Sequence, residues 1–272
     1  DSHNDTFIID AVLTGSIHGQ GWGDTLKGDL IDAVTITDDS NWSGFSGAAS
    51  GISDGFQGID HVIGNGNTGS YFTGHDVAST WALDGTPTYN DGSDTLSVSG
   101  FATLQGSNNT DAFNVTSASS FNLNGGTGND TFDIDAALTG AIDGEAGTDT
   151  LQGNNIDGVL ITTLDANGAD GTEASVSGNF NNIQTLTGNA GTLTGLAAAS
   201  TWGLDGTPTY TSGGFAVDFS GFATLQGGNN TDAFNVTAAS SFNLNGGAAN
   251  DTFDIDANLT GAIDGEAGTD TL

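Results

Sequence analysis

Three stretches decide the fold: "LQGSNNTDAF" (residues 104–113), "LNGGTGNDTF" (123–132) and "IDGEAGTDTL" (142–151). They start 19 residues apart and place the same residue types at the same positions: an aliphatic residue first, then glycine, aspartate, and Phe or Leu last. A second series with this pattern starts at residues 225, 244 and 263. A fixed stride of this kind indicates a chain that repeats one structural unit.

Short strands are predicted around the apolar positions. In "FNV" (113–115), "FNL" (121–123) and "FDI" (132–134), large apolar residues alternate with Asn or Asp, as in strands with one buried face. Strands and turns recurring at this stride predict a parallel β-solenoid, whose coils pair about 4.8 Å apart. We therefore predict an all-β, right-handed parallel β-solenoid (β-helix or β-roll) of roughly 19-residue coils, with Phe113 stacked on Phe132.

A longer repeat contains the short one. Residues 80–151 align without gaps with 201–272, and the opening segment 4–26 matches 129–151. The array is expected to continue beyond both ends in a longer protein. The chain then divides into the tail of a preceding module (1–26), a first module (27–151) and a second module (152–272), all in one continuous solenoid.

The stride loosens between the regular parts. Residues 27–79 and 152–200 align only weakly with each other, and they hold turn-rich stretches such as "DDSNWSGFSGAASGISDG" (38–55). Wider or irregular coils with excursions are predicted there. "TGLAAAST" (194–201) is predicted to form a single helical turn.

The charge balance excludes several partners. The chain has 34 Asp and Glu residues, one basic residue (Lys27) and a net charge of -33. Nucleic acid and anionic membrane surfaces need many Lys or Arg residues, so both are excluded as partners. No apolar run is long enough to span a bilayer, so no membrane insertion is expected. The absence of Cys, with abundant Gly, Asn and Thr, is typical of proteins outside bacterial cells.

Stacked aspartates predict a cation site. Carboxylates about 4.8 Å apart in a column repel one another by about 1 kcal/mol per pair in water. Glycines beside them allow backbone carbonyls to point inward, and calcium accepts many oxygens in loose geometry. Diffuse cations, or aspartates that cap backbone amides without any ion, are the alternatives. The predicted Ca²⁺ ligands are Asp130 with Gly126, Gly128 and Asn129, and the equivalent aspartates Asp24, Asp111, Asp149, Asp232, Asp251 and Asp270.

"GGTGNDTFD" (125–133) resembles the RTX nonapeptide G-G-x-G-x-D-x-Φ-x, and this resemblance implies a calcium-binding parallel β-roll. "GTGNDTFDIDAALTGAID" (126–143) is similar to the coil repeat of ice-binding β-solenoids in giant RTX adhesins. "GFATLQGGNNTDAFNV" (221–236) resembles repeats of very large secreted bacterial surface proteins. The second module departs from the RTX pattern, because Ala248 and Ala249 replace Thr127 and Gly128.

Other motifs predict structural roles. "GNGNTG" (64–69) fits G-x-G-x-x-G, but no helix is expected after it, so a turn is predicted in place of a dinucleotide site. Trp81 and Trp202 are predicted to fill the core, with a carbohydrate platform as the alternative. The histidines do not have the spacing of a zinc site; they are His3, His18, His61 and His75.

An enzyme is not expected. Parallel β-helices include polysaccharide lyases and hydrolases, and Asp133 and Asp135 are spaced to share an outward face. However, binding an acidic sugar needs Arg or Lys, which this chain almost lacks.

These observations predict a non-catalytic repeat region of an extracellular bacterial surface, matrix or filament protein. Calcium would stabilise it, and it would serve as a rigid spacer, adhesin stalk or fibre. Exposed strand edges could pair end to end with further copies. The alternatives are an ice- or polysaccharide-binding module and a polysaccharide lyase or hydrolase. The file of Thr127, Asn108 and Ala146 is irregular for ice binding.

Overall fold

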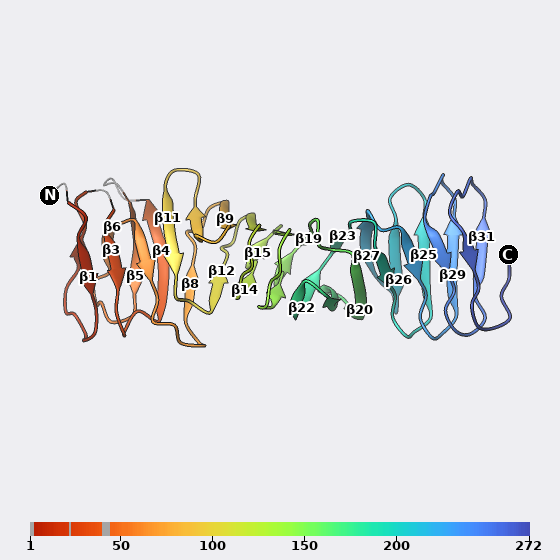
Figure 1. Cartoon of the computed structure of the whole chain (residues 1–272), viewed down its shortest axis with the longest axis horizontal. Helices are drawn as coiled ribbons and strands as arrows, with labels where there is room; N and C mark the ends of the chain where they lie inside the picture. The colour runs from red at the N-terminus through yellow and green to blue at the C-terminus, as the bar shows by residue number, and fades with distance from the viewer. Residues whose placement is uncertain (1–2, 22, 40–43) are drawn as a thin grey trace.

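The computed structural model describes residues 3–21, 23–39 and 44–272. In these ranges the chain is all-β, and no residue is helical. The strands follow one another along an elongated rod that has the two termini at opposite ends (Figure 1). Part of the predicted excursion, residues 40–43, lies outside the described residues.

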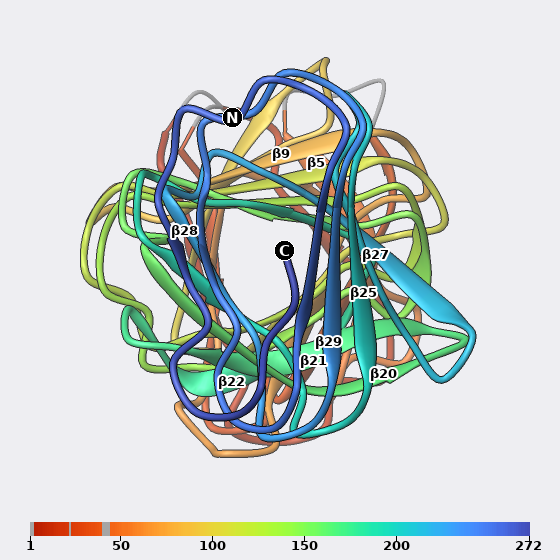
Figure 2. The same ribbon diagram turned by 90° about the vertical axis from the view of Figure 1, so that its right-hand side faces the viewer.

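Two long sheets form opposite walls of the rod, as β28 and β29 show in the axial view (Figure 2). In spatial order, the first wall contains β1 (Thr6–Ile8), β3 (Thr25–Lys27), β7 (His61–Ile63), β11 (Thr95–Ser99), β10 (Thr88–Asn90), β9 (Ser79–Leu83), β13 (Asp111–Val115), β16 (Thr131–Ile134), β19 (Thr150–Gln152), β23 (Thr185–Thr187), β27 (Phe215–Ser220), β26 (Thr209–Ser212), β25 (Ser200–Leu204), β29 (Asp232–Val236) and β31 (Thr252–Ile255). The second wall contains β2 (Ile17–His18), β6 (Phe56–Ile59), β5 (Phe45–Ala49), β4 (Ala33–Asp39), β8 (Tyr71–Thr73), β12 (Thr103–Gln105), β14 (Asn122–Asn124), β17 (Ile142–Asp143), β22 (Val176–Ile183), β21 (Gly168–Glu173), β20 (Gly158–Asp165), β24 (Thr192–Thr194), β28 (Thr224–Gln226), β30 (Asn243–Asn245) and β32 (Ile263–Asp264). A small third sheet pairs β15 (Thr127–Gly128) with β18 (Ala146–Gly147).

Parallel pairing follows the sequence stride where that stride is regular. We call each passage of the chain through both walls a coil. Leu104 pairs with Leu123, and Leu123 with Ile142, in the second wall. Phe113 pairs with Phe132 in the first wall. The same columns recur in the second module. Long parallel sheets of this kind make the fold β-solenoid-like.

Aromatic rings stack through the core along the rod. The rings of Phe113 and Phe132 lie 5.2 Å apart at 8° between planes, and Trp81 stacks on Phe113 at 5.3 Å. In the second module, Trp202 stacks on Phe234 at 5.6 Å. All five side chains are fully buried. The prediction that both tryptophans belong to the core is confirmed.

Antiparallel three-stranded meanders interrupt the parallel walls. They are β4–β5–β6 and β20–β21–β22 in the second wall, and β9–β10–β11 and β25–β26–β27 in the first. The two in the second wall lie within 27–79 and 152–200, where irregular coils with excursions are predicted, and the two in the first wall lie almost entirely outside these ranges. A tight turn explains how the β9–β10–β11 meander begins. Asp84 Oδ1 accepts the backbone N–H of Thr86 at 3.0 Å, and Gly85 has a φ of +102°. An Asx turn followed by Pro87 is a turn signal that reverses the chain within one wall.

The meanders alternate between the walls along the chain, so that the two walls have the same number of strands in the part of the chain that the structure describes. Each meander adds two strands to one wall only, and the order along the chain is second, first, second, first. Within the described residues, both walls therefore reach 15 strands. Walls of equal length can stay packed face to face at one strand spacing, so the rod does not have to bend.

Two local expectations have clear outcomes. Residues 64–69 form a turn between β7 and β8, without a following helix, as predicted. The predicted helical turn at 194–201 is wrong, because this segment consists of the end of β24, a bend and the start of β25. Pairing of β24 with β28 and of β25 with β29 holds both ends of the segment in an extended conformation.

Candidate functional site

Aspartates form two ladders, one in each module, that link successive coils. In each step, a carboxylate oxygen accepts the backbone N–H of the aspartate 19 residues earlier. Asp130 Oδ1 accepts from Asp111 at 2.8 Å, and Asp149 Oδ1 accepts from Asp130 at 2.9 Å. Asp251 Oδ1 accepts from Asp232 in the same way at 2.8 Å. These five residues are at most 1% exposed, so the ladders belong to the interior at these residues.

Neutral side chains close the ladder at its ends. Asp111 accepts the hydroxyl of Ser79 and the backbone N–H of Ser107, the latter at 2.7 Å. Ser200 donates to Asp232 in the same way in the second module. At the other end, Gln184 Oε1 accepts the backbone N–H of Asp149. The sequence reasoning missed these partners, although Ser79 and Ser200 precede the "TW" pair of both modules.

Steric exclusion explains why the residue five positions before each of these aspartates is glycine. A Cβ on Gly125 would lie 2.3 Å from Asp130 Oδ2, and one on Gly106 would lie 2.6 Å from Asp111 Oδ2. The equivalent glycines of the other steps meet their aspartates in the same way; they are Gly19, Gly144, Gly227, Gly246 and Gly265. The G-x-x-x-x-D spacing therefore lets a carboxylate lie directly against the backbone.

The other predicted ligands are engaged within the fold. Gly126 and Gly128 have φ values of +103° and +148°, as expected for glycine in a tight turn. The Gly126 carbonyl accepts the backbone N–H of Ala146 at 3.0 Å. Asn129 is exposed, and its Oδ1 accepts the backbone N–H of Thr148 at 2.9 Å. These groups thus link neighbouring coils.

The structure groups the predicted aspartates but does not join them in one place. Asp111, Asp130 and Asp149 form one ladder, while Asp232, Asp251 and the exposed Asp270 form another. Asp24 accepts instead from Asp5. Among the described residues, no cluster of three or more His, Cys, Asp or Glu side chains is arranged to hold a metal ion.

One oxygen of several ladder carboxylates is left without a partner. The Oδ2 atoms of Asp24, Asp130, Asp149 and Asp251 are buried and accept no hydrogen bond. These atoms suit a cation, because a buried unpaired anionic oxygen is costly, whereas the Gly126 carbonyl and the Asn129 amide are already bonded. Calcium therefore stays a prediction.

Burial raises the pKa values of the ladder carboxyls. It raises the pKa of Asp130 to about 7, and the nearby charges of Asp111, Asp149 and Glu145 add to this effect. Burial also raises the pKa of Asp149 to about 6. The pKa values of Asp111, Asp232 and Asp251 are raised as well, chiefly by burial. Desolvation opposes the charged form of a carboxyl, and like charges at a short distance do the same.

The carboxylate pair considered for catalysis has a local structural role. Asp135 Oδ1 accepts both the backbone N–H and the side-chain amide of Asn154, each at 2.8 Å. Burial and the charge of Asp135 raise the pKa of Asp133. Both carboxylates line an open pocket of about 330 Å³ together with Gln152 and Asn189.

Comparison of the chain with protein-family models, curated proteins and solved structures gives no match. The class of protein therefore follows from the fold and the ladders alone: an all-β, solenoid-like rod. Its described residues contain no helix with the length and apolar character needed to cross a membrane.

Proposed function

We propose that the chain is a non-catalytic, rigid rod that forms part of an extracellular bacterial surface, matrix or filament protein. It would act as a spacer, adhesin stalk or fibre segment. In this proposal the coils wind as a right-handed parallel solenoid with about 19 residues in each regular coil. Calcium bound at the aspartate corner, and end-to-end pairing of copies, are parts of the proposal that need their own tests.

The continuity of the walls carries this proposal. Both walls run through both modules without a break in strand pairing, from β1 to β31 and from β2 to β32. The modules are joined by paired strands, since β19 of the first pairs with β23 of the second. A stacked array of this kind resists bending at the boundary, because each repeat is packed on its neighbour.

Small-angle X-ray scattering over a range of salt concentrations tests the rigidity. Fourteen strand spacings of about 4.8 Å give a rod of roughly 67 Å. We expect this length to stay the same at low and high salt, although the net charge is -33. A flexible pair of modules with this charge would expand at low salt as its carboxylates repel. A maximum dimension that grows at low salt would refute the rigid rod.

Sedimentation over a wide concentration range tests the filament version. Association that increases with concentration would support end-to-end pairing, and a strictly monomeric chain would remove it. Catalysis is tested by incubation with acidic and neutral glycans. We expect neither new reducing ends nor unsaturated products.

A further inference from the structure

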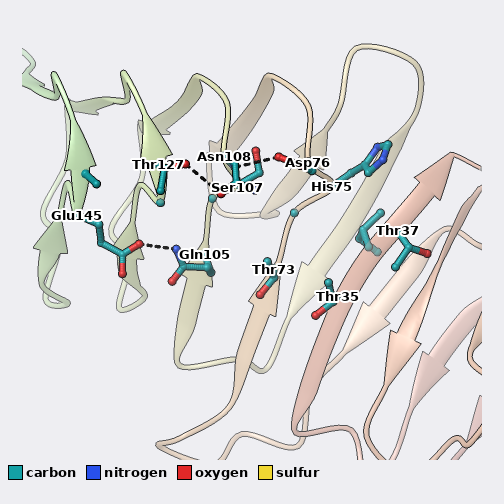
Figure 3. A pocket seen from close by; sticks show the side chains of 15 residues that line it. Thr35, Thr37, Thr73, His75, Asp76, Gln105, Ser107, Asn108, Thr127 and Glu145 are labelled. Carbon is teal, nitrogen blue, oxygen red and sulfur yellow. Dashed lines mark hydrogen bonds between the residues drawn. The ribbon is translucent and has the colours of Figure 1, made fainter.

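A groove with many polar side chains runs along the edge of the second wall at which successive strands end. Its volume is about 730 Å³, and it crosses the ends of five successive strands. Figure 3 shows Thr35, Thr73, Gln105 and Glu145 one after another along the groove. Four strand spacings of about 4.8 Å make it roughly 19 Å long. The groove therefore has room for an extended chain lying along the rod axis.

The second module has the same groove. Its volume is about 580 Å³, and its lining includes Thr194, Gln226 and Glu266. These residues lie 121 positions after Thr73, Gln105 and Glu145, the spacing of the two modules. A longer meander strand ends each groove, because β4 and β20 extend beyond their neighbours β8 and β24. The groove is thus a regular product of the module.

The same hydrogen-bonded pair lies in each groove. Gln105 Nε2 donates to Glu145 Oε2 at 2.8 Å, and Gln226 Nε2 donates to Glu266 Oε2 at 2.8 Å. Both glutamates have left-handed backbone conformations, with φ values of 62° and 60°. This conformation is unfavourable for a residue other than Gly, Asn or Asp. A strained residue with the same side-chain partner in both copies points to a use beyond turn formation.

The chemistry of the lining selects the ligand. The residues that line the first groove include no Lys, Arg, Phe, Tyr or Trp side chain, and the ring of its His75 lies 3.8 Å from the carboxylate of Asp91. Anionic ligands would meet a protein of net charge -33 that has a single Lys and no Arg, so electrostatic repulsion opposes their binding. Hydroxyl and amide side chains are the most numerous polar groups of the lining, from Thr35, Thr73, Gln105, Ser107 and Asn108. The carboxylates of Asp76 and Glu145 and the imidazole of His75 also line the groove. We propose that these grooves bind a neutral, hydroxyl-rich chain, an uncharged polysaccharide, with Glu145 and Gln105 as its central contacts.

The two grooves are expected to differ in affinity. Several polar groups of the first are apolar in the second, where Leu160 stands for Thr35 and Leu196 for His75. Ala248 likewise replaces Thr127. Fewer hydrogen-bonding groups remain for a hydroxyl-rich ligand, so the first groove should bind more tightly.

Isothermal titration of the whole chain with defined polysaccharides tests this proposal. The neutral probes are dextran, laminarin and mannan; alginate is the anionic probe and chitosan oligomers are the cationic one. We expect saturable binding of at least one neutral probe, with an affinity that does not change with salt, and no binding of alginate. Binding of chitosan oligomers alone, lost at high salt, would overturn the assignment, and so would no binding of any probe.

Two variants and a control locate the site. Asn tolerates left-handed φ, so Glu145→Asn and Glu266→Asn should fold and remove the carboxylate. Glu145→Asn should weaken binding about tenfold or more, and Glu266→Asn less than about threefold. The control Asp254→Asn, which removes an exposed carboxylate on the first wall, should change nothing.

Measuring the Tm of the same variants distinguishes a ligand-binding role of Glu145 from a purely structural role. If Glu145 only braces neighbouring coils, Glu145→Asn should lower the Tm and leave binding unchanged, and this result would overturn the proposal. If Glu145 serves the ligand, the Tm should stay the same or rise while binding falls. If the polysaccharide-binding proposal fails, the rigid-rod proposal still stands, because the scattering experiment does not depend on the groove.

Discussion

Asp130 and Asp111 are joined by a hydrogen bond that crosses from one coil to the next: the carboxylate of Asp130 accepts the backbone N–H of Asp111 at 2.8 Å. Both side chains are at most 1% exposed. The bond fixes the register of two coils at their corner, where the first-wall strands β13 and β16 begin. The same carboxylate carries an unpartnered oxygen, so one residue both supports the fold and stores unfavourable electrostatic energy. This conflict gives measurable consequences.

The rod should be more stable at mildly acidic than at alkaline pH. The pKa values of Asp130 and Asp149 are about 7 and 6 in the fold, against about 3.9 in an unfolded chain. A carboxyl whose pKa is raised by folding binds protons better in the folded state. The contribution of such a carboxyl to the free energy of unfolding is therefore complete below its pKa in the unfolded chain. This contribution is lost as the pH rises through its pKa in the folded chain. We expect a Tm at pH 5 that exceeds the Tm at pH 8 by about 5 °C or more.

This measurement is made in the presence of a chelator, so that no divalent cation neutralises the ladder. The control is Asp130→Asn, in which one titrating group is absent and the difference between the two pH values should be smaller. A Tm that rises steadily from pH 5 to pH 8 in chelator would contradict the raised pKa values.

Asp130→Asn also decides the role of calcium. The Asn side chain keeps an oxygen that can accept the N–H of Asp111, and it removes a buried charge. Without a bound cation, we expect it to raise the Tm at pH 8 and to leave the Tm nearly unchanged at pH 5. If calcium binds Asp130, then millimolar calcium should stabilise the original chain and not the variant, since a ligand of the folded state raises its midpoint. Melts of both proteins with calcium and with chelator distinguish the two cases.

Gly125→Ala should strongly destabilise the rod. The added Cβ would lie 2.3 Å from Asp130 Oδ2 and 2.8 Å from the Gly144 carbonyl, so the corner must shift. We expect a loss of about 2–4 kcal/mol in the free energy of unfolding, measured by urea titration. Gly69→Ala is the matched control, because its Cβ would meet nothing within 4 Å. Equal effects of the two substitutions would show that the close approach at Gly125 is not important.

Much of the regular fold could be predicted from the sequence, because identical residues stack when the stride equals one coil. The pairs Phe113 with Phe132 and Leu104 with Leu123 follow directly from the 19-residue spacing. The aspartate column followed from the same spacing, and capping of backbone amides was one of the predicted alternatives. The calcium site stays a prediction, because a column of carboxylates alone does not specify what neutralises it.

The meanders and the groove could not be predicted from the spacing. A reversal of the chain within one wall replaces parallel neighbours by antiparallel ones, as when Trp81 pairs with Tyr89, and such a pair has no fixed stride. The Asp84–Gly85 turn before Pro87 indicates a chain reversal, but the 19-residue repeat alone does not predict it. The Gln105–Glu145 bond joins residues 40 positions apart, and it depends on a left-handed backbone at Glu145 that composition does not reveal.

Ala249→Gly should stabilise the second module. Ala249 replaces Gly128 of the first module and has a φ of 89°, which is unfavourable for a residue with a Cβ. The pairing beside it is also reduced: Thr127–Gly128 pairs with Ala146–Gly147 as two short strands, whereas only an isolated bridge joins Ala248 to Ala267. We expect Ala249→Gly to raise the free energy of unfolding by about 1 kcal/mol, or the Tm by roughly 2–4 °C.

The neighbouring control is Ala248→Gly, where φ is not positive. This substitution should be neutral or destabilising by up to about 1 kcal/mol, because glycine adds entropy to the unfolded chain. Hydrogen exchange should show slower exchange near residue 267 in Ala249→Gly alone; a lower Tm in that variant would mean that the corner prefers the methyl group to a relaxed backbone.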